Sequence, residues 1–201
     1  QADAVAAPLA RAGAWGPDAL HRLTAFAAGG KMVRGGLLLL AASMHGRPRS
    51  RAALAAAAAM ELLHSSLLVH DDIMDNDRLR RGSATVFAQY EKLARGDKAA
   101  AFGRSMGICA GDVGFFAAWD ILSRLAVEPG RKARVLGLVA GEMCAVGAAQ
   151  MQDVALGTFA RLPGPDEVLD LYLHKTARYT FSLPLACGAI LAGAGEAAVN
   201  R

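Results

Sequence analysis

Aromatic residues are scarce in this sequence, and so are runs of β-branched residues. Phe, Trp and Tyr make up 6% of the 201 residues, whereas 54% of the residues are hydrophobic. Strands favour aromatic and β-branched side chains, while alanine, which is abundant here, is the strongest helix former. The composition therefore argues against a sheet-rich protein and predicts packed helices, with enough apolar residues for one sizeable core or at most two small ones.

Cysteine is also rare. Cys109, Cys144 and Cys187 stand far apart in the sequence, each in apolar surroundings. An odd number of cysteines without close spacing excludes a disulfide framework and a cysteine-based zinc site. We therefore expect a protein of a reducing compartment, and place it in the cytoplasm.

The sequence lacks both long basic tracts and long uninterrupted apolar runs. The net charge is only +4 and the basic residues are scattered, so nucleic acid is not an expected partner. Gly35–Ala42 is too short to cross a membrane. Phe181–Val199 is long enough, but it contains Ser182, Pro184 and Glu196. We therefore expect no membrane span.

Start and stop signals divide the chain into a series of predicted helices. Ser50 is a predicted N-cap, and Pro184 is expected to kink or interrupt the last helix. No repeat and no linker rich in Ser and Gly divides the chain, so we predict one all-α domain over residues 1–201, a bundle of long antiparallel helices. The predicted helices cover residues 17–30, 31–45 (ended by Gly46 and Pro48), 50–77, 97–129 and 131–156, and a last one starts at 165.

Residues 70–82, HDDIMDNDRLRRG, concentrate acids and then arginines. On a helix with about 100° per residue, Asp71 and Asp75 share a face, His64 lies on that face two turns earlier, and Asp72 points about 100° aside. Two carboxylates at this spacing repel each other, so a bound cation is expected to offset the repulsion. Mg²⁺ suits one or two carboxylates together with substrate phosphates. The alternative is a solvated helix end whose acids happen to cluster.

Basic residues accompany the acids. Arg80 and Arg81 are adjacent, and arginine forks match phosphate oxygens, although a cation there could also complement the helix dipole. In GGKMVRGG (29–36), Lys31 and Arg34 stand at i and i+3 at a predicted helix start, and the glycines allow a ligand to approach the backbone. Ordinary surface charge is the alternative there. Acids and arginines together predict a metal–diphosphate site.

Several segments, in this order along the chain, carry a family resemblance: GGKMVR, ELLHSSLLVHDDIMDNDRLRRGSATV, AGD (110–112), Gln150 with Asp153, and HKTARYT (174–180). From about Gly29 to Ala194 the chain resembles the trans-isoprenyl diphosphate synthases, or polyprenyl synthetases, and most of all the bacterial geranylgeranyl diphosphate synthases. The segment DDIMD…RRG is highly specific, whereas GGK-x-x-R and the Lys-Thr pair are specific only in company. The resemblance implies an isoprenoid synthase fold, with helices around a central cavity for the prenyl tail, and a homodimer.

The resemblance also implies a role for each motif residue. Asp71 and Asp75, supported by Asp72, bind Mg²⁺ that bridges to the allylic diphosphate. Arg80 matches the allylic side and Arg81 the isopentenyl side. The other implied substrate-binding residues are Lys31, Arg34 and His64 for isopentenyl diphosphate, Lys175 and Thr176 near the allylic diphosphate, and Gln150, accompanied by Asp153, near the reacting carbons. For His64 the alternative is an ordinary core histidine.

The implied reaction is a Mg²⁺-dependent head-to-tail condensation of isopentenyl diphosphate with dimethylallyl, geranyl or farnesyl diphosphate. The allylic C–O bond breaks, the double bond of isopentenyl diphosphate attacks the carbocation, and a proton leaves to the released diphosphate. The surrounding apolar helices must exclude water. We take Asp71, Asp75, Arg80 and Lys175 as catalytic because they would stabilise the leaving diphosphate. We predict geranylgeranyl diphosphate (C20) as product, with C25 or longer as the alternative.

Product length is expected to depend on side chains that stop the growing tail. The resemblance places this stop at the fifth and fourth positions before the acidic motif, which are Ser66 and Leu67. Ser66 is small, so farnesyl diphosphate is not the expected end point. Leu63 lies one turn deeper, and Phe115 and Phe116 could form a floor. The alternative is that all of these are ordinary core residues.

The family's second aspartate-rich motif has no match after Lys175. Three explanations stay open: the chain is incomplete at its C-terminus and lacks the last helices, it is a non-catalytic regulatory subunit, or it is a degenerate homologue. We favour the first, and expect the 201 residues alone not to complete a catalytic cycle. A terpene cyclase is disfavoured by GGK-x-x-R and RRG, and a calcium protein by the lack of a suitable ligand loop. A helical bundle without a ligand is the remaining alternative.

Overall fold

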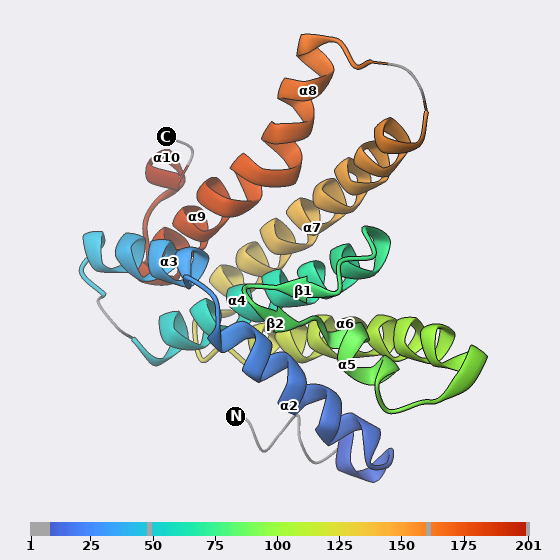
Figure 1. Cartoon of the computed structure of the whole chain (residues 1–201). Helices are drawn as coiled ribbons and strands as arrows, with labels where there is room; N and C mark the ends of the chain where they lie inside the picture. Colours follow the sequence, from blue (N-terminus) through green and yellow to red (C-terminus); the bar gives the residue numbers. More distant parts are fainter. Residues whose placement is uncertain (1–8, 48–49, 160–161, 200–201) are drawn as a thin grey trace. The chain divides into compact units, whose positions relative to one another are not determined.

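The computed structural model describes residues 9–47, 50–159 and 162–199. Most of these residues are helical, and within these ranges the only strands form one antiparallel hairpin (Figure 1). The prediction of an all-α fold is confirmed; Pro48, a predicted helix stop, lies outside the described residues. The elements are α2 (Trp15–Ala28), α3 (Val33–Met44), α4 (Arg51–Met74), β1 (Leu79–Arg80), β2 (Ser83–Ala84), α5 (Val86–Glu91), η1 (Gly96–Lys98), α6 (Ala99–Ser123), α7 (Pro129–Thr158), α8 (Pro165–Tyr172), η2 (Leu173–Ser182), α9 (Leu183–Ala192) and α10 (Glu196–Val199).

The chain divides into two compact units. The first unit comprises Gln1–Lys31 and Ala58–Ile121, and the second unit comprises Met32–Ala57 and Leu122–Arg201. The first unit therefore holds α2, the hairpin, α5 and most of α6, and the second holds α3 and α7 to α10, while α4 contributes to both. The prediction of a single domain over residues 1–201 stays a prediction.

The core of the first unit joins α2 and α5 to the last turns of α4 and to α6. On α2, Ala19, Leu23 and Phe26 recur every three or four residues, which places them on one helical face. Tyr90 of α5 is fully buried in the same cluster. The buried centre of the cluster consists of Ala19, Leu23, Val69, Val86, Tyr90 and Ala110.

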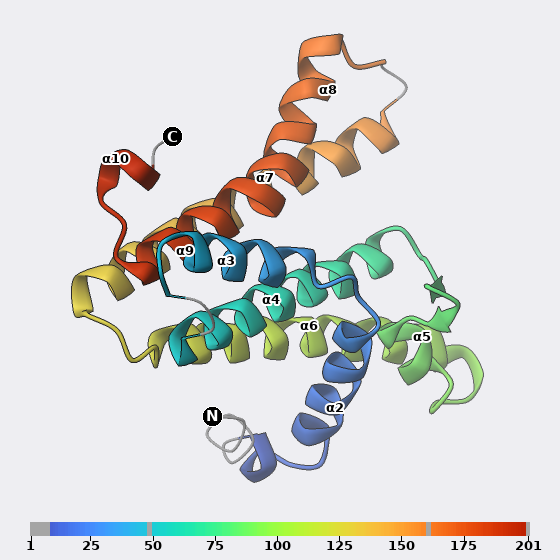
Figure 2. The same ribbon diagram turned by 90° about the vertical axis from the view of Figure 1, so that its left-hand side faces the viewer.

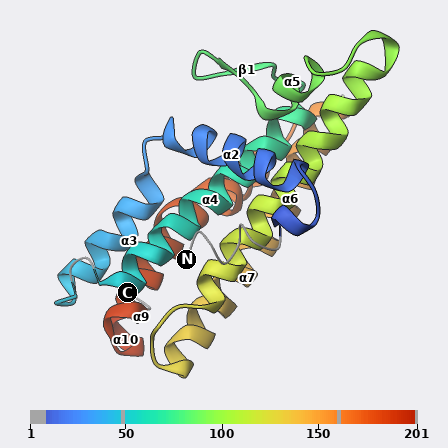
Figure 3. The ribbon, with the colours of Figure 1, turned by 90° about the horizontal axis from the view of Figure 1, so that it is seen from below.

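Glycines of α6 allow α4 to pack closely against it in the first unit, where the two helices run side by side (Figures 2 and 3). A Cβ atom at Gly107 would lie 2.8 Å from Ile73 Cδ1, and one at Gly111 would lie 2.3 Å from His70 Nε2. Such separations are too short for non-bonded carbon and nitrogen atoms in a packed interior. The two glycines are therefore required for this helix contact.

The helix ends agree in part with the predictions. Ser50 is the N-cap of α4, as predicted, because its Oγ accepts a hydrogen bond of 3.1 Å from the Ala53 amide. α4 ends at Met74, earlier than predicted, and Asn76 then adopts a left-handed backbone with φ 56°. The hairpin and α5 that follow were not predicted. Short elements of this kind carry little periodicity from which a sequence could reveal them.

The prediction that Lys31 and Arg34 share a face of one helix is wrong. α3 begins at Val33, and Met32 before it has a left-handed backbone with φ 52° and ψ 36°. Lys31 therefore precedes the helix, and the chain changes direction between the two basic residues. A left-handed backbone at a non-glycine residue is uncommon and has no clear sequence signal here.

In the second unit, α3 packs against α9. A Cβ atom at Gly188 of α9 would lie 2.2 Å from the Leu38 carbonyl oxygen and 2.9 Å from Ala41 Cβ, so the α9 backbone touches α3 directly. α7 runs antiparallel to the continuous segment of α8 and η2 (Figures 1 and 2). The continuous segment from α8 to α9 thus packs against α7 through α8 and η2, and against α3 through α9.

The segment 173–182 forms a π-helix, η2, before the chain returns to α-helix at α9. At the junction, the Leu183 amide donates to the Arg178 carbonyl, five residues earlier. Pro184, which lacks an amide hydrogen, occupies the first turn of α9. The chain stays helical through Pro184, so the helix is not interrupted there, and the kink expected at Pro184 stays a prediction. A ten-residue π-helix is rare, and π-helical turns are frequent at functional sites.

By length and composition, the helices Arg51–Met74, Gly96–Ser123 and Pro129–Thr158 could each cross a membrane. This corrects the expectation that no stretch has the length and apolarity of a span, because abundant alanine raises the hydropathy of whole helices rather than of short runs. Half of the apolar window of Arg51–Met74 is buried inside the structure, where it has a packing role. That the protein has no membrane span stays a prediction.

The contact between α3 and α9 generates a stability test. Gly188→Ala should lower the free energy of unfolding by about 1–3 kcal/mol, because the new methyl group overlaps the Leu38 carbonyl. Gly137→Ala on α7 is the matched control, since nothing lies within 4 Å of a Cβ there. It should leave stability unchanged or raise it by about 0.5–1 kcal/mol. Urea denaturation measures both; equal effects at the two positions would contradict the close packing.

Candidate active site

The acidic motif stands where α4 ends. Asp71 lies in the last turn of α4, and the Asp75 amide donates to the Asp71 carbonyl at 2.9 Å, so the helical spacing continues through Asp75. Asp71 and Asp75 are therefore one turn apart, as predicted. Asp71 is half-buried and Asp75 is exposed. This spacing allows both carboxylates to reach one ligand.

Asp72 points elsewhere and is fully buried. Its Oδ1 accepts a hydrogen bond of 2.5 Å from Arg80 Nε, whereas its Oδ2 is buried without a hydrogen-bond partner. Burial raises the pKa of Asp72 to about 6, although the nearby Arg80 opposes the rise. Asp72 thus holds Arg80 in the structure. Its role as a supporting metal ligand stays a prediction.

Arg80 belongs to β1 of the hairpin and lies among the acids. Its Nη2 is 3.7 Å from Asp71 Oδ2 and 3.9 Å from Asp77 Oδ2. These distances are long for hydrogen bonds, so the close contact of Arg80 is the one through Nε to Asp72. Arg80 offsets the mutual repulsion of three carboxylates while keeping its terminal nitrogens near the acidic motif.

Arg81 turns toward a different part of the first unit. Arg81 and Gly82 occupy the hairpin turn with φ 54° and 77°, a pair of values typical of a type I′ turn. The Arg81 guanidinium reaches the end of α2: a Cβ at Gly30 would be 3.2 Å from Arg81 Nη1, and the Phe26 ring centroid is 5.9 Å from its guanidinium carbon. The structure therefore brings Arg81 close to the segment that leads into Lys31. The family resemblance assigns both Arg81 and Lys31 to the isopentenyl side.

In the second unit, η2 holds Arg34 of α3. Arg34 Nη2 donates to Thr180 Oγ1 at 2.6 Å, and the guanidinium carbon lies 4.3 Å from the centroid of the Tyr179 ring. Arg34 Nε is buried without a hydrogen bond. Sequence reasoning had singled out HKTARYT for its Lys-Thr pair and missed this role of its last two residues. A link between segments so far apart in the chain leaves no local signal.

η2 is also tied to α7 through ion pairs. Lys175 pairs with Asp153, and Arg178 pairs with Glu142, with Nε 3.3 Å from Oε2. Asp153 had been expected only to accompany Gln150, which lies half-buried on α7 three residues earlier. The pairing gives Asp153 a definite partner, and it holds the side chain of Lys175 beside α7.

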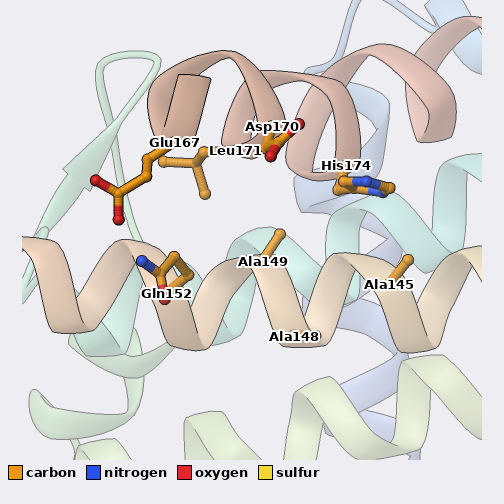
Figure 4. A pocket seen from close by; sticks show the side chains of 8 residues that line it. All are labelled: Ala145, Ala148, Ala149, Gln152, Glu167, Asp170, Leu171 and His174. Carbon is orange, nitrogen blue, oxygen red and sulfur yellow. The ribbon is translucent and has the colours of Figure 1, made fainter. Parts of the chain in front are cut away.

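A cavity of about 420 Å³ lies between α7 and the segment of α8 and η2 (Figure 4). Its α7 wall is mainly alanine, whereas polar side chains of Gln152, Glu167 and His174 stand around it. None of the predicted site residues lines it. The lining residues are Ala145, Ala148, Ala149, Gln152, Glu167, Asp170, Leu171 and His174.

The predicted chain-length residues have diverse surroundings. Ser66 is fully buried, its Oγ donates to the Leu62 carbonyl at 2.9 Å, and a Cβ at Gly114 would lie 2.1 Å from that Oγ. Leu63 is also fully buried, whereas Phe116 is 73% exposed. Leu67, Phe115 and the predicted ligand His64 are half-buried. Their functional roles stay predictions, and a larger residue at Ser66 would first disturb the packing of α4 on α6.

His70 was missed by sequence reasoning, although it directly precedes Asp71. Its Nε2 lies 3.1 Å from the Ile108 carbonyl oxygen and 3.5 Å from Asp112 Oδ1 on α6, and its ring packs edge-on against Phe115 at 5.4 Å between centroids. Asp112 is the acid of the AGD segment. These contacts attach the turn that carries Asp71 to α6.

Among residues 9–47, 50–159 and 162–199, no group of three or more His, Cys, Asp and Glu side chains is arranged to hold a metal ion. Asp71 and Asp75 remain as a pair of carboxylates one turn apart. Two carboxylates together with water and phosphate oxygens are a donor set that fits Mg²⁺. The pair is insufficient for a site built from protein ligands alone.

The buried pair of Asp72 and Arg80 generates a prediction about stability. Arg80→Gln should lower the free energy of unfolding at pH 7 by about 3–5 kcal/mol, because it leaves the Asp72 carboxylate buried without its cation. The loss should be smaller at pH 5, since the pKa of Asp72 is already about 6 with Arg80 present and a protonated carboxyl needs no cation.

Arg78→Gln is the matched control for this prediction. Arg78 lies in the same segment, but its ion pair with Glu91 is on the surface, so its loss should change stability little. Denaturant unfolding of metal-free protein at both pH values measures the effect. A pH-independent loss for Arg80→Gln would contradict the proposed cause.

The chain matches the Polyprenyl synthetase family over residues 19–201. It is 31% identical over 182 residues to the geranylgeranyl diphosphate synthase of Methanosarcina mazei, which covers 90% of this chain and 52% of that protein. It is 32% identical over 173 residues to the synthase of the same name from Sulfolobus acidocaldarius, covering 85% of this chain and 48% of that protein. The chain thus spans about half the length of the curated relatives it matches.

Solved structures of similar proteins have the same fold as this chain. The geranylgeranyl pyrophosphate synthase of Corynebacterium glutamicum, complexed with isoprenyl diphosphate and magnesium, superposes with a TM-score of 0.86 at 31% identity, covering 98% of this chain and 58% of that chain. The synthetase from Geoglobus acetivorans gives a TM-score of 0.77 at 31% identity, covering 92% and 56%. These likenesses confirm the predicted isoprenoid synthase fold. The chain belongs to the polyprenyl synthetase family.

Proposed function

We propose that the full-length protein containing this chain is a Mg²⁺-dependent trans-prenyltransferase. It condenses isopentenyl diphosphate with dimethylallyl, geranyl or farnesyl diphosphate to give geranylgeranyl diphosphate and diphosphate. The observation that carries the proposal is the arrangement at the end of α4, where Asp71 and Asp75 stand one turn apart beside Arg80 and the hairpin directs Arg81 toward Gly30. Family membership and relatives named as geranylgeranyl diphosphate synthases support it.

The chain's own residues divide the work of binding two diphosphates. Arg80 keeps its Nε on Asp72, so its terminal nitrogens are the atoms that would bind the allylic diphosphate beside Asp71. Arg81 and Lys31 would bind the diphosphate of isopentenyl diphosphate near the end of α2. By the resemblance, His64 and Arg34 serve the isopentenyl side, and Lys175, Thr176 and Gln150 serve the allylic side and the reacting carbons.

The chemistry follows from charge stabilisation. Asp71 and Asp75, with Asp72 in support, would hold Mg²⁺, which when bound would withdraw electron density from the allylic diphosphate and favour its departure. Arg80 and Lys175 stabilise the negative charge on the leaving group. The allylic C–O bond breaks, the isopentenyl double bond forms the new C–C bond, and the proton goes to the released diphosphate. The electron pair of the C–O bond leaves with the diphosphate, the π pair of isopentenyl diphosphate forms the C–C bond, and the pair of the broken C–H bond forms the new double bond, so no side-chain base is required.

The product class rests on the names of the relatives and on the small residue at Ser66. A structure titled as a farnesyl or geranylfarnesyl diphosphate synthase, from Zymomonas mobilis, also superposes, with a TM-score of 0.75 at 26% identity. A longer product of C25 or more is therefore the second candidate. We also propose a cytoplasmic homodimer; light scattering of the purified full-length protein tests the dimer.

Turnover of radiolabelled isopentenyl diphosphate with farnesyl diphosphate and Mg²⁺ tests the proposed function. The full-length protein should form C20 product, and chelation of Mg²⁺ should abolish it. Asp71→Asn and Asp75→Asn should each lower kcat on the order of 10³-fold, about 4 kcal/mol of transition-state stabilisation. Asp97→Asn, an exposed acid of η1, is the control and should keep full activity. Absence of product with every primer would favour the regulatory-subunit alternative.

The division between the two arginines makes a second kinetic prediction. Arg81→Lys should raise KM for isopentenyl diphosphate about tenfold with KM for farnesyl diphosphate unchanged, because lysine lacks the planar fork that binds a phosphate at two oxygens. Arg80→Lys is the matched variant and should raise KM for farnesyl diphosphate instead. Steady-state kinetics with each substrate varied in turn measures both. The same change for both variants would contradict the assignment.

A further inference from the structure

Arg22 on α2 is a half-buried arginine that the proposed chemistry does not use. Its side chain is 19% exposed, its Nε and Nη2 donate to the two carboxylate oxygens of Asp18 at 2.9 and 3.2 Å, and its guanidinium carbon lies 4.6 Å from the centroid of the buried Tyr90 ring. These contacts hold the Arg22 side chain in one position. Asp18 raises the pKa of Arg22, so the guanidinium stays charged at every relevant pH.

A third hydrogen bond connects Arg22 to Gln89 of α5 and, through Gln89, to the hairpin. Arg22 Nη1 donates to Gln89 Oε1 at 2.8 Å, and Gln89 Nε2 donates to the Ala84 carbonyl at 2.8 Å. Ala84 belongs to β2 and pairs with Leu79 of β1, the strand that continues into Arg80 and Arg81. Arg22 therefore holds the hairpin through a single glutamine.

The same two elements meet again at the substrate-binding residues. The Arg81 guanidinium lies against Gly30, just after the end of α2, eight residues beyond Arg22. The six residues from Arg22 to the end of α2 at Ala28 correspond to about 9 Å along the axis. α2 is thus connected to the hairpin at Arg22 through Gln89 and at Gly30 through Arg81, in addition to the apolar packing of α2 on α5.

The hairpin has a separate attachment to the end of α4. Arg80 pairs with Asp72 in the last turn of α4. Thr85 closes the base of the hairpin, since its Oγ1 donates to the Asp77 carbonyl at 2.8 Å and its amide donates to the Arg78 carbonyl at 3.1 Å. These contacts do not involve Arg22. Arg80 is therefore held on α4 by a contact separate from the one between Arg22 and Gln89.

We propose that Arg22, acting through Gln89, is a positioning residue for the isopentenyl diphosphate subsite, because it sets the distance between Arg81 and the Gly29–Lys31 segment. The inference rests on the proposed function for the identity of the substrate. The geometric claim, that Arg22 controls an anion-binding site between α2 and the hairpin, is independent of turnover.

Kinetics of Arg22→Met in the full-length protein test the proposal. KM for isopentenyl diphosphate should rise about tenfold, equivalent to about 1.4 kcal/mol, while KM for farnesyl diphosphate and kcat at saturation stay within about twofold. Arg104→Met, which alters an exposed arginine of α6, is the matched control and should change none of these. An equal rise in both KM values, or a loss of thermal stability with both KM values unchanged, would overturn the proposal.

Gln89→Glu provides a second variant that keeps Arg22 paired. The glutamate still accepts from Arg22 but cannot donate to the Ala84 carbonyl, so the connection breaks at the hairpin alone. It should reproduce the selective rise in KM for isopentenyl diphosphate. If Arg22→Met does not fold, Gln89→Glu alone tests the proposal. An unchanged KM for isopentenyl diphosphate in Gln89→Glu would overturn the proposal.

Calorimetric titration separates this proposal from the proposed function. If the wild-type protein forms no prenyl product, the proposed function fails, and inorganic diphosphate then serves as the probe. Weaker diphosphate binding by Arg22→Met or Gln89→Glu than by wild type and Arg104→Met would still support an anion site positioned by Arg22. Equal binding by all four proteins, or no binding by any, would overturn it.

Discussion

The buried ion pair between Asp72 and Arg80 is the contact on which the arrangement of the first unit depends. It connects the last turn of α4, which carries Asp71, to the hairpin that carries both arginines. Because Asp72 is fully buried, its ionised carboxylate needs a compensating cation, and Arg80 of the hairpin supplies it. Asp71 and Asp75 lie one turn apart, and Asp72 points about 100° aside from them.

Pairing of cations with the chain's own acceptors recurs in the second unit. Lys175 is paired with Asp153, and Arg34 with Thr180 and the Tyr179 ring, and both arrangements depend on η2. These partners offset the positive charges of Lys175 and Arg34 and order both side chains.

The parts of the site that were predictable are those that depend on local spacing. Asp71 and Asp75 share a helical face because four residues make about one turn, and Ser50 caps α4 because its hydroxyl can reach the Ala53 amide. The same spacing argument was wrong for Lys31 and Arg34, because Met32 has a left-handed backbone and α3 begins only after it. His70 was missed because its partners lie on α6, far away in the chain.

The sequence by itself determined the helical class, the family and the identity of the charged motif residues. These follow from composition, periodicity and a specific order of motifs, all of which are local properties of the chain. Only the tertiary structure decided that Asp72 serves Arg80, that Arg81 turns to Gly30, and that Asp153 holds Lys175. Each of these depends on a contact between separate elements, and a buried charge takes whichever partner the packing of those elements brings within reach.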